Sequence, residues 1–338
     1  MTIQKDVSLL LYNTFGLDAR ADYFAEVNNI AELRAAINSK LSPVLLLGGG
    51  SNILFTTDVR GLVIKNNIGG MRLLKTFSRK VWVEIGGGEN WHQFVCWAVA
   101  QGFGGIENMS LIPGTVGAAP IQNIGAYGVE LKDVFVRLNA IHLETGKEKV
   151  FTRKSCQFGY RDSIFKRSEK GKWCITSVVF SLTRYSHRIN INYGDIRKTL
   201  ETNGIRRPGI ADISQAVIQI RQSKLPDPAE IGNCGSFFKN PETEASVLKA
   251  ILHDYPLAPH FPLPDGRVKI PAGWLIEQCG WKGKRVGNTG SYEKQALVLV
   301  NHGGATGEEV KNLAQAIIDS VHAKFGIRLE PEVNMWPW

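Results

Sequence analysis

The stretch SLIPGTVGAAPIQNIGAYG, from Ser110 to Gly128, decides the fold of this 338-residue chain. It contains no acid or base, and most of its residues are small, bent or apolar. Small residues let the backbone approach a ligand closely, and backbone N–H groups are good partners for phosphate oxygens. Two shorter glycine loops precede it, Leu47-Gly-Gly-Gly-Ser-Asn52 and Ile85-Gly-Gly-Gly-Glu-Asn90. Each loop alone can be an ordinary tight turn, but the three together predict a site for a large, phosphate-bearing cofactor.

The composition is that of an ordinary soluble globular protein, with 43% hydrophobic and 21% charged residues. A chain of this length exceeds the usual size of one hydrophobic core, so we expect more than one domain. No apolar run approaches the roughly 20 residues that span a membrane, and the first residues lack the pattern of a signal peptide. The five cysteines are widely spaced without a C-x-x-C pair, which favours reduced thiols. We therefore expect a cytoplasmic protein without membrane insertion.

The formal net charge of +9 is compatible with binding of nucleic acid, with binding of an acidic small molecule, or with no specific ligand. Because the basic residues are scattered and no nucleic-acid-binding motif accompanies them, we favour a multiply anionic small molecule over RNA or DNA. A basic nucleotide- or RNA-binding protein is the non-enzymatic alternative, and it rests on charge alone. The sequence indicates no obligate protein partner.

Hydrophobic periodicity predicts helices at residues 28–40 and 91–101, and strands at residues 44–47, 80–85, 134–142 and 173–182. Farther along the chain, it predicts helices at residues 213–224, 243–253 and 272–279. A capping box, Thr306-Gly-Glu-Glu309, opens another amphipathic helix, and residues 327–333 are predicted to form a final strand.

These elements predict an α+β protein with a cofactor-binding region at residues 1–184, formed by subdomains at about 1–66 and 67–184. A second α+β domain is expected at residues 185–304, where the composition changes. The helix and strand of residues 305–338 are expected to return to the first region.

Motifs typical of other chemistries are absent from the sequence. Neither G-x-G-x-x-G nor G-x-x-x-x-G-K-[ST] occurs, so a Rossmann site and a P-loop have no support. H-E-x-x-H, clusters of cysteine and histidine, and G-x-S-x-G are also missing, so we expect no metal site and no hydrolase elbow. The glycine loops are therefore expected to bind their cofactor in another fold.

A second group of reactive side chains surrounds Lys224 and Ser236. Lys224 ends a predicted helix before Pro226, so its amine is held in place, although a lysine there can also simply complement the helix dipole. Ser236 follows Gly235 and precedes two phenylalanines, with Lys239 close by. It is a candidate proton donor, whereas a serine in a glycine turn is usually only a turn residue.

Seven motifs occur in an order that resembles the UDP-N-acetylenolpyruvoylglucosamine reductase family. They are Gly48-Gly-Gly-Ser-Asn52, the tract from Ile112-Pro-Gly-Thr-Val-Gly117 to Ile124-Gly-Ala-Tyr-Gly128, Phe158-Gly-Tyr-Arg-Asp-Ser163, Lys224-Leu-Pro-Asp-Pro228, Gly235-Ser-Phe-Phe-Lys-Asn-Pro241, Ala272-Gly-Trp-Leu-Ile-Glu277 and Leu329-Glu-Pro-Glu-Val333. The resemblance runs from Asn13-Thr-Phe-Gly16 almost to the C-terminus, and the ordered set is far more specific than any single motif.

The resemblance implies non-covalent FAD in a fold of the vanillyl-alcohol-oxidase and p-cresol methylhydroxylase type, with a separate α+β substrate-binding domain. The implied cofactor contacts are in the three glycine loops and on an arginine that suits the phosphates. They are Gly48, Gly49, Gly50, Ser51, Asn52, Gly88, Asn90, Pro113, Gly114, Thr115, Gly117, Ala118, Gln122, Asn123, Gly125, Ala126, Tyr127, Gly128 and Arg221. His92 and Cys96 are near the loops, but because the family binds FAD without a covalent bond, both are interpreted as helix residues.

The resemblance also implies reduction of UDP-N-acetylglucosamine enolpyruvate to UDP-N-acetylmuramate by NADPH, for peptidoglycan synthesis. A hydride reaches C3 of the enolpyruvyl group through FAD, and a proton reaches C2. Arg161 and Glu332 match residues that stabilise the negative charge at C2, and Ser236 matches the proton donor. Glu332 can help only when protonated or acting through a water, because a bare carboxylate would repel that charge. Since one pocket serves NADPH and substrate in turn, we expect ping-pong kinetics.

Seven residues match positions that contact the substrate: Tyr160, Tyr193, Lys224, Asn240, Phe261, Lys282 and Gln295. The two tyrosines can equally be core residues, and Lys282 can be merely solvated. Phe261 departs from the pattern, because relatives with this longer substrate domain usually carry a tyrosine in the loop over the sugar nucleotide. The enzymatic alternative, an FAD oxidase or dehydrogenase for another substrate, leaves Ser236, Lys224 and Glu332 without an evident task.

Overall fold

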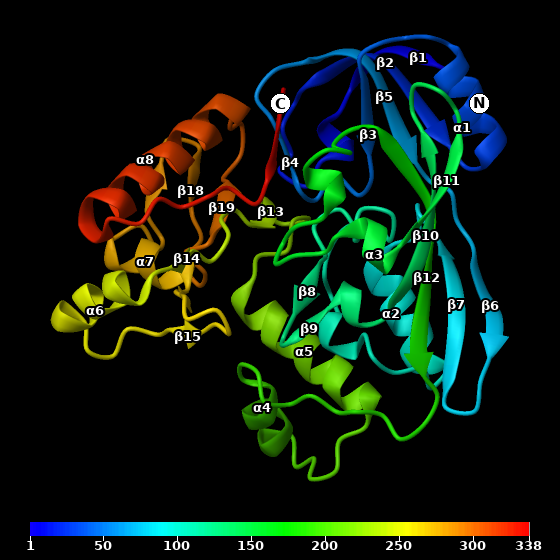
Figure 1. Cartoon of the computed structure of the whole chain (residues 1–338). Coiled ribbons are helices and arrows are strands. Elements are labelled where there is room, and N and C mark those ends of the chain that lie inside the picture. The colour runs from blue at the N-terminus through cyan, green and yellow to red at the C-terminus, as the bar shows by residue number, and fades with distance from the viewer. Residues whose placement is uncertain (338) are drawn as a thin grey trace. The chain divides into compact units, whose positions relative to one another are not determined.

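The computed structural model describes residues 1–337 (Figure 1). The chain forms two compact units, each built from separate segments. Unit 1 contains Met1–Val7, Arg20–Gly49 and Val59–Ser223, whereas unit 2 contains Ser8–Ala19, Gly50–Asp58 and the chain from Lys224 onward. The division after Ser223 differs from the sequence-based boundaries at residues 184 and 304, since residues 185–223 pack with unit 1.

Unit 1 includes a four-stranded sheet, ordered β1 (Gln4–Ser8), β2 (Arg20–Val27), β5 (Val59–Asn66) and β3 (Val44–Leu47). Both β2 and β3 pair with β5 in parallel. Helix α1 (Ile30–Asn38) joins β2 to β3 and lies within the predicted range of residues 28–40. Its start is fixed by Asn29, whose side-chain oxygen accepts a hydrogen bond from the Glu32 N–H at 2.9 Å.

A second sheet of unit 1 has five antiparallel strands, ordered β11 (Glu148–Thr152), β10 (Phe135–His142), β12 (Trp173–Thr183), β7 (Lys80–Gly86) and β6 (Met71–Thr76). Helix α2 (Trp91–Ala100) packs on it, with the rings of Phe94 and Phe180 centred 4.9 Å apart. The helix stops at the predicted place, because Gly102 follows with a φ of 70° that other residues rarely adopt.

Two helices complete unit 1, α4 (Ile196–Thr202) and α5 (Ile210–Lys224), and they share a small apolar core. The sequence predicted α5 but not α4, because seven residues between polar loops show little periodicity. Short elements connect the layers: η2 (Glu107–Met109), β8 (Gly125–Ala126), β9 (Val129–Glu130), η3 (Leu131–Asp133), α3 (Arg153–Cys156) and η4 (Ile164–Lys166).

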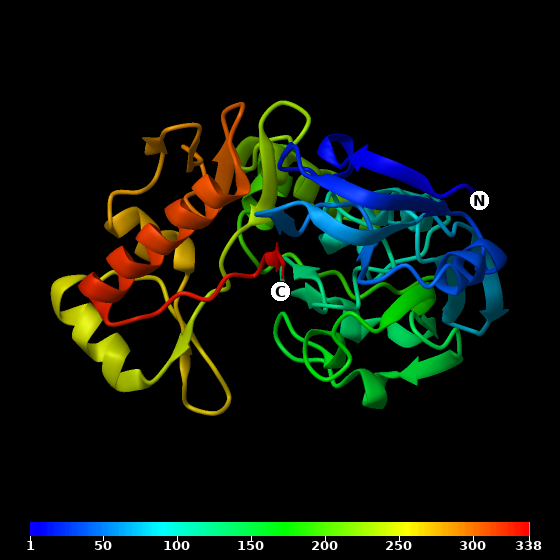
Figure 2. The same ribbon diagram turned by 90° about the horizontal axis from the view of Figure 1, so that it is seen from above.

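Unit 2 has one large apolar core, to which α8 (Gly307–Phe325), drawn in orange to red in Figure 2, contributes a buried face. Its shorter helices are η1 (Leu10–Tyr12), α6 (Ala245–Asp254) and α7 (Ala272–Gln278). One antiparallel sheet has the order β13 (Gly232–Ser236), β19 (Val298–Asn301), β18 (Thr289–Ser291) and β17 (Arg285–Val286). A smaller sheet has the order β14 (Glu242–Thr243), β16 (Val268–Lys269) and β15 (Phe261–Pro262).

The last strand of the described chain is β20 (Asn334–Trp336), which pairs in parallel with β4 (Ile53–Phe55) inside unit 2. The prediction of a final strand at residues 327–333 is therefore wrong. Pro331 has no N–H to donate to a ladder, so this segment cannot form a regular strand pair across its length. It makes an isolated bridge to Phe238 instead.

The first turn of α8 is held by the capping box that the sequence predicted. The Thr306 hydroxyl accepts a hydrogen bond from the Glu309 N–H at 3.2 Å, and the Glu309 carboxylate accepts one from the Thr306 N–H at 2.7 Å. Replacing Thr306 with alanine should lower the free energy of unfolding by about 1 kcal/mol, because one helix N–H loses its partner. Thr306→Ser should remain near wild type. Urea denaturation followed by circular dichroism tests this, and equal midpoints for Thr306→Ala and wild type would contradict it.

Candidate functional site

The glycine loops of unit 1 pack backbone against backbone. A Cβ atom added to Gly49 would lie 2.7 Å from the Cα atom of Gly114, and one added to Gly117 would lie 2.8 Å from the Gly87 carbonyl oxygen. The Gly117 N–H donates a hydrogen bond to that same oxygen at 2.8 Å. Side chains would push these loops apart, so glycine is required at the contacts.

The first loop continues from unit 1 into unit 2 at Gly50. Gly50 has a φ of 64°, and a Cβ there would lie 2.0 Å from the Tyr12 carbonyl oxygen. Farther on, the Asn52 carbonyl accepts hydrogen bonds from the backbone and side-chain nitrogens of Asn334, at 3.3 and 3.0 Å. The predicted residues Gly50, Ser51 and Asn52 are thus fixed to elements of unit 2, whereas Gly48 and Gly49 belong to unit 1.

Four non-glycine residues at or near the Ser110–Gly128 tract have a left-handed backbone. They are Leu111, Asn123, Tyr127 and Arg161, with φ values of 58°, 47°, 48° and 50°. Such conformations are unfavourable for L-residues and persist only where their surroundings hold them, and they gather at functional sites. The strain therefore marks the same region as the glycine loops.

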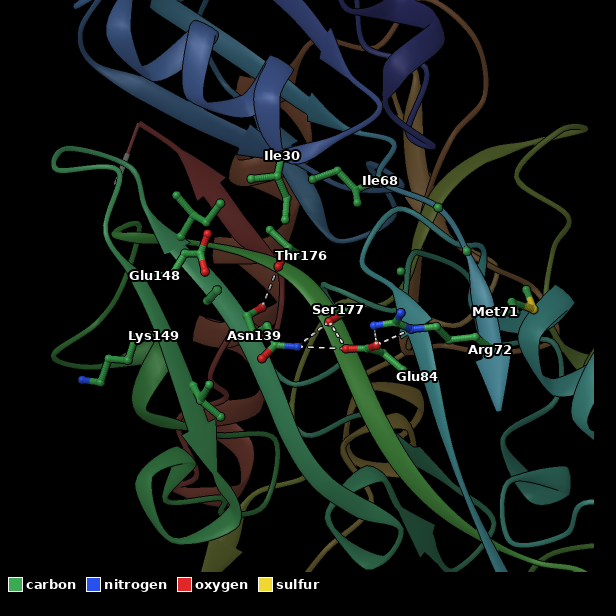
Figure 3. Close-up of a pocket in the computed structure, with 16 residues that line it drawn as sticks. Ile30, Ile68, Met71, Arg72, Glu84, Asn139, Glu148, Lys149, Thr176 and Ser177 are labelled. Carbon is green, nitrogen blue, oxygen red and sulfur yellow. Dashed lines mark hydrogen bonds and ion pairs between the residues drawn. The ribbon is translucent and has the colours of Figure 1, made fainter. Parts of the chain in front are cut away.

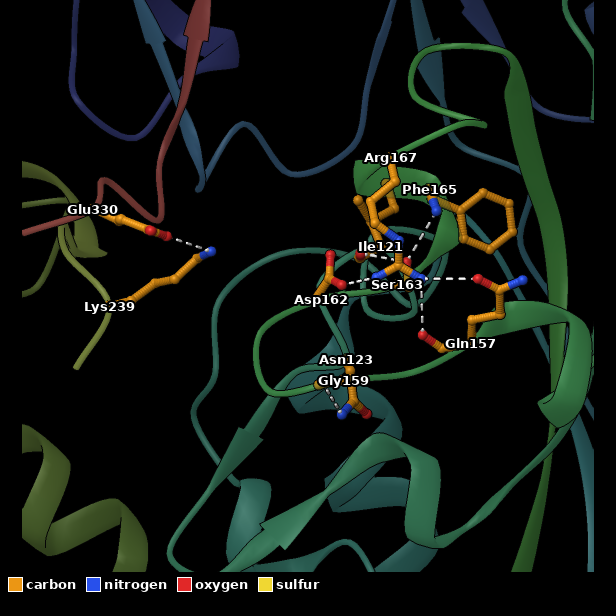
Figure 4. A network of polar contacts seen from close by, with 10 residues as sticks. All are labelled: Ile121, Asn123, Gln157, Gly159, Asp162, Ser163, Phe165, Arg167, Lys239 and Glu330. Atoms are coloured by element: carbon orange, nitrogen blue, oxygen red, sulfur yellow. Dashed lines mark hydrogen bonds and ion pairs between the residues drawn. The ribbon is translucent and has the colours of Figure 1, made fainter. Parts of the chain in front are cut away.

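A polar network fixes the turn of residues 159–163 to the tract (Figure 4). The side-chain amide of Asn123 donates to the Gly159 carbonyl at 2.9 Å, and the Ser163 hydroxyl donates to the Ile121 carbonyl at 2.6 Å. Arg167 forms an ion pair with Asp162 on the same turn. The network holds the segment that carries Tyr160 and Arg161.

Arg161 and Arg221 bring two positive charges to the tract. Arg161 donates from Nη2 to the Gly125 carbonyl at 2.7 Å, and Arg221 donates from Nε to the Leu111 carbonyl at 3.2 Å. Burial lowers the pKa of the Arg221 guanidinium; the Tyr127 side chain raises it, and the nearby Arg161 charge lowers it. Within residues 1–337, no carboxylate forms an ion pair with Arg221.

These observations fit the diphosphate of FAD. A partly buried cation without a carboxylate partner is costly unless an anion neutralises it. The glycine-rich loops let backbone N–H groups approach a ligand closely. Arg221, the first loop and the tract are thus suited to the phosphates.

Unit 2 brings together two of the three residues expected to be catalytic. The Glu332 N–H donates to the Phe237 carbonyl at 2.8 Å, so Glu332 lies beside the residue that follows Ser236. Ser236 ends β13 with an exposed side chain, and its hydroxyl has no hydrogen-bond partner within residues 1–337. Burial first, and then the charge of Glu332, raise the pKa of the neighbouring Cys234 thiol.

The residues expected to bind substrate are divided between the units. Tyr160 and Tyr193 belong to unit 1, where Tyr193 is 47% exposed and makes an edge-to-face contact with Tyr127 at 6.4 Å between centroids. The other five belong to unit 2: Lys224, Asn240, Phe261, Lys282 and Gln295.

Three of the unit 2 residues also have structural contacts. Asn240 accepts a hydrogen bond from the Ala272 N–H at 2.9 Å, at the start of α7. Gln295 accepts one from the Leu297 N–H at 3.3 Å, and Lys282 pairs with Glu277 at 2.9 Å. Phe261 is 48% exposed in β15.

A separate pocket of about 620 Å³ lies in unit 1, on the five-stranded sheet beside the start of α1 (Figure 3). The Glu84 carboxylate in it accepts hydrogen bonds from Arg72, Asn139 and Ser177, at 2.6, 2.9 and 2.9 Å. Gly86 is the only residue of the glycine loops that lines it. Because the buried carboxylate has its partners within the sheet, the network serves the fold.

Two residues near the loops were not predicted to have a role. The Lys65 ammonium donates to the Gly48 carbonyl, and burial lowers the pKa of Lys65. His92 accepts a hydrogen bond at Nδ1 from the Leu111 N–H, at 3.0 Å. A lysine within the apolar strand Val59–Asn66 was a usable signal for the first, whereas nothing in the sequence indicated the second.

Within residues 1–337, no helix is both long and apolar enough to cross a membrane. The same residues contain no group of three or more histidine, cysteine, aspartate or glutamate side chains that could hold a metal ion.

Comparisons with known proteins identify both halves of the chain. Residues 21–151 match the family described as FAD binding domain. Residues 227–336 match the family described as UDP-N-acetylenolpyruvoylglucosamine reductase, C-terminal domain.

Curated relatives with the name UDP-N-acetylenolpyruvoylglucosamine reductase match almost the whole chain. The protein of Flavobacterium johnsoniae is 50% identical over 336 residues, which cover 99% of this chain and 100% of the relative. That of Azoarcus sp. is 52% identical over 339 residues, which cover 98% of this chain and 97% of the relative.

The crystal structure of UDP-N-acetylenolpyruvylglucosamine reductase from Thermus caldophilus is 24% identical and superposes with a TM-score of 0.67, covering 100% of both chains. This likeness supports the fold, and with the FAD-binding family it confirms the expected fold class. The relatives at about half identity over nearly the full length settle the family. The chain belongs to the UDP-N-acetylenolpyruvoylglucosamine reductase family.

Proposed function

We propose that this chain reduces UDP-N-acetylglucosamine enolpyruvate to UDP-N-acetylmuramate with NADPH and FAD in the cytoplasm, for peptidoglycan synthesis. Family membership over nearly the full length supports the reaction. The observation that supports the residue assignment is the hydrogen bond from the Glu332 N–H to the Phe237 carbonyl, which brings Glu332 next to the residue that follows Ser236. Purified protein should be yellow, release FAD on denaturation and oxidise NADPH only with the enolpyruvyl sugar nucleotide. A colourless protein without flavin would contradict the proposal.

The glycine loops and Arg221 hold the cofactor in this proposal. When bound, FAD supplies hydride transfer from NADPH to C3 of the enolpyruvyl group. The glycines of the loops contribute backbone N–H groups as hydrogen-bond donors, and the positive guanidinium of Arg221 attracts the negatively charged diphosphate. Asn123 acts indirectly, because its side chain is engaged with the Gly159 carbonyl and fixes the adjoining turn.

Arg161 is assigned to the negative charge that develops at C2 and spreads into the substrate carboxylate. Its guanidinium is already oriented by the bond from Nη2 to the Gly125 carbonyl, at 2.7 Å. Donors that are aimed before the reaction stabilise developing charge without a cost of reorganisation at that moment. Glu332 shares this task in its protonated form or through a water, since an ionised carboxylate repels the same charge.

Ser236 is assigned to protonate C2. Its hydroxyl is exposed and has no partner within residues 1–337, so it is free to face a ligand. A serine is a weak acid, so its proton must be replaced by a more acidic group, and Lys224 or a bound water is assigned to this task. Substrate binding is assigned to Tyr160, Tyr193, Lys224, Asn240, Phe261, Lys282 and Gln295.

The first test concerns the cofactor loops. Gly49→Ala places a methyl group 2.7 Å from the Gly114 Cα atom, and overpacking of this kind costs about 1–3 kcal/mol. We expect the FAD dissociation constant to rise about tenfold or more. Gly209→Ala is the matched control, because its new Cβ would have only an ordinary contact, 3.7 Å from Asp212. Fluorescence titration of apoprotein with FAD measures both, and equal affinities would refute this placement of the loops.

The second test concerns the proton donor. In Ser236→Ala, NADPH should still bleach the flavin absorbance, while substrate-dependent turnover should fall about 10²- to 10⁴-fold. Ser246→Ala, at an exposed position of α6, is the control and should turn over like wild type. Undiminished turnover of Ser236→Ala would remove the assigned role.

The third test concerns the departure at position 261. Phenylalanine can cover the substrate but has no hydroxyl to donate to its diphosphate. Phe261→Tyr should lower KM about fivefold, which corresponds to one added hydrogen bond of about 1 kcal/mol. Phe325→Tyr, whose ring packs in an aromatic group with Trp274 and Tyr255, should leave KM unchanged. Steady-state kinetics decides, and an unchanged or higher KM for Phe261→Tyr would contradict the substrate contact.

A further inference from the structure

The second residue of the tract, Leu111, is held by side chains from two helices. The Leu111 N–H donates to Nδ1 of His92 on α2, at 3.0 Å, and the Leu111 carbonyl accepts from Nε of Arg221 on α5, at 3.2 Å. All of these groups belong to unit 1. Both polar backbone groups of one residue are therefore satisfied by side chains rather than by secondary structure.

Leu111 needs this support because its backbone is strained. Its φ of 58° lies in the left-handed region, which is unfavourable for a leucine. Without the two side chains, the residue would relax toward an ordinary conformation. Such a change would move the start of the tract and the carbonyl that orients Arg221.

We propose that neutral His92 is a positioning residue that holds Leu111, and through it Arg221, in the arrangement that binds the FAD diphosphate, so that protonation of His92 weakens FAD binding. This inference rests on the proposed cofactor loops. It adds a residue to them and makes cofactor affinity depend on pH.

The hydrogen bond fixes the protonation state of the ring. Nδ1 accepts the Leu111 N–H, so the single proton of the neutral imidazole is on Nε2. The groups that face the ring are Arg221 from α5, the Leu111 N–H from the tract and the Cys96 thiol one turn along α2, with Sγ 3.8 Å from Nδ1 and 3.7 Å from Nε2. No carboxylate contacts the ring within residues 1–337.

The direction of the pH effect follows from these neighbours. Burial and then the Arg221 charge hold the pKa of His92 below its ordinary value of 6.5. The ring is therefore a neutral acceptor at neutral pH, and FAD affinity is fully present there. As the pH falls through the lowered pKa, a proton on Nδ1 removes the acceptor and adds a positive charge beside Arg221. Affinity should fall with it, in the acidic range below 6.5.

Two substitutions at His92 separate the role of the acceptor from that of bulk. His92→Asn can present its side-chain oxygen where Nδ1 lies and cannot be protonated. His92→Leu fills the space without an acceptor. At pH 7.5, we expect His92→Asn to bind FAD within about twofold of wild type and His92→Leu about tenfold more weakly, because the partly buried Leu111 N–H loses its partner. His253→Leu, at an exposed position of α6, is the matched control.

The readout is FAD titration of apoprotein by fluorescence between pH 5 and 7.5, with a thermal melt of each apoprotein. Wild type should lose affinity at acidic pH while His92→Asn stays level. If His92→Leu does not fold, the profiles of wild type and His92→Asn still decide.

Three results would overturn the inference: parallel pH profiles for wild type and His92→Asn, a wild-type affinity that rises at acidic pH, or a His92→Leu variant that binds FAD as tightly as wild type. If Gly49→Ala also binds like wild type, the loop placement itself fails; if Gly49→Ala binds weakly, only the role of His92 fails.

Discussion

The structure of unit 1 depends on direct contact between the backbones of glycine loops. Gly49 against Gly114 and Gly117 against Gly87 leave no space for even a methyl group. These contacts hold three segments of the chain together through their peptide groups. Specific recognition by peptide groups comes from the direction of N–H and C=O groups, which the fold fixes before any ligand arrives.

The charges around the loops follow from the same arrangement. The glycine loops contain no lysine or arginine, so the cations come from neighbouring elements: Arg221 from α5, Arg161 from the adjoining turn and Lys65 from β5. Each donates to a loop carbonyl, which orients the cation and shields part of its charge. The cations therefore hold the loops, and in the proposed site the same side chains would attract the anionic cofactor.

The sequence predicted the elements whose signals are local. The caps at Asn29 and Thr306 and the stop at Gly102 set the limits of α1, α8 and α2 with little help from the rest of the chain. The order of the motifs identified the family that the relatives confirm.

What the sequence could not predict depends on distant partners. The final strand was misplaced because β20 forms by pairing with β4, which lies near the other end of the chain, and no local pattern reveals that partner. His92 resembled any helix residue, since its role exists only when Leu111 adopts a positive φ.

The pairing of β20 with β4 has a consequence for biosynthesis. Because β4 leaves the ribosome long before β20, with Thr56 and Trp336 separated by 280 positions, the nascent chain must carry an unpaired apolar strand edge for most of its synthesis.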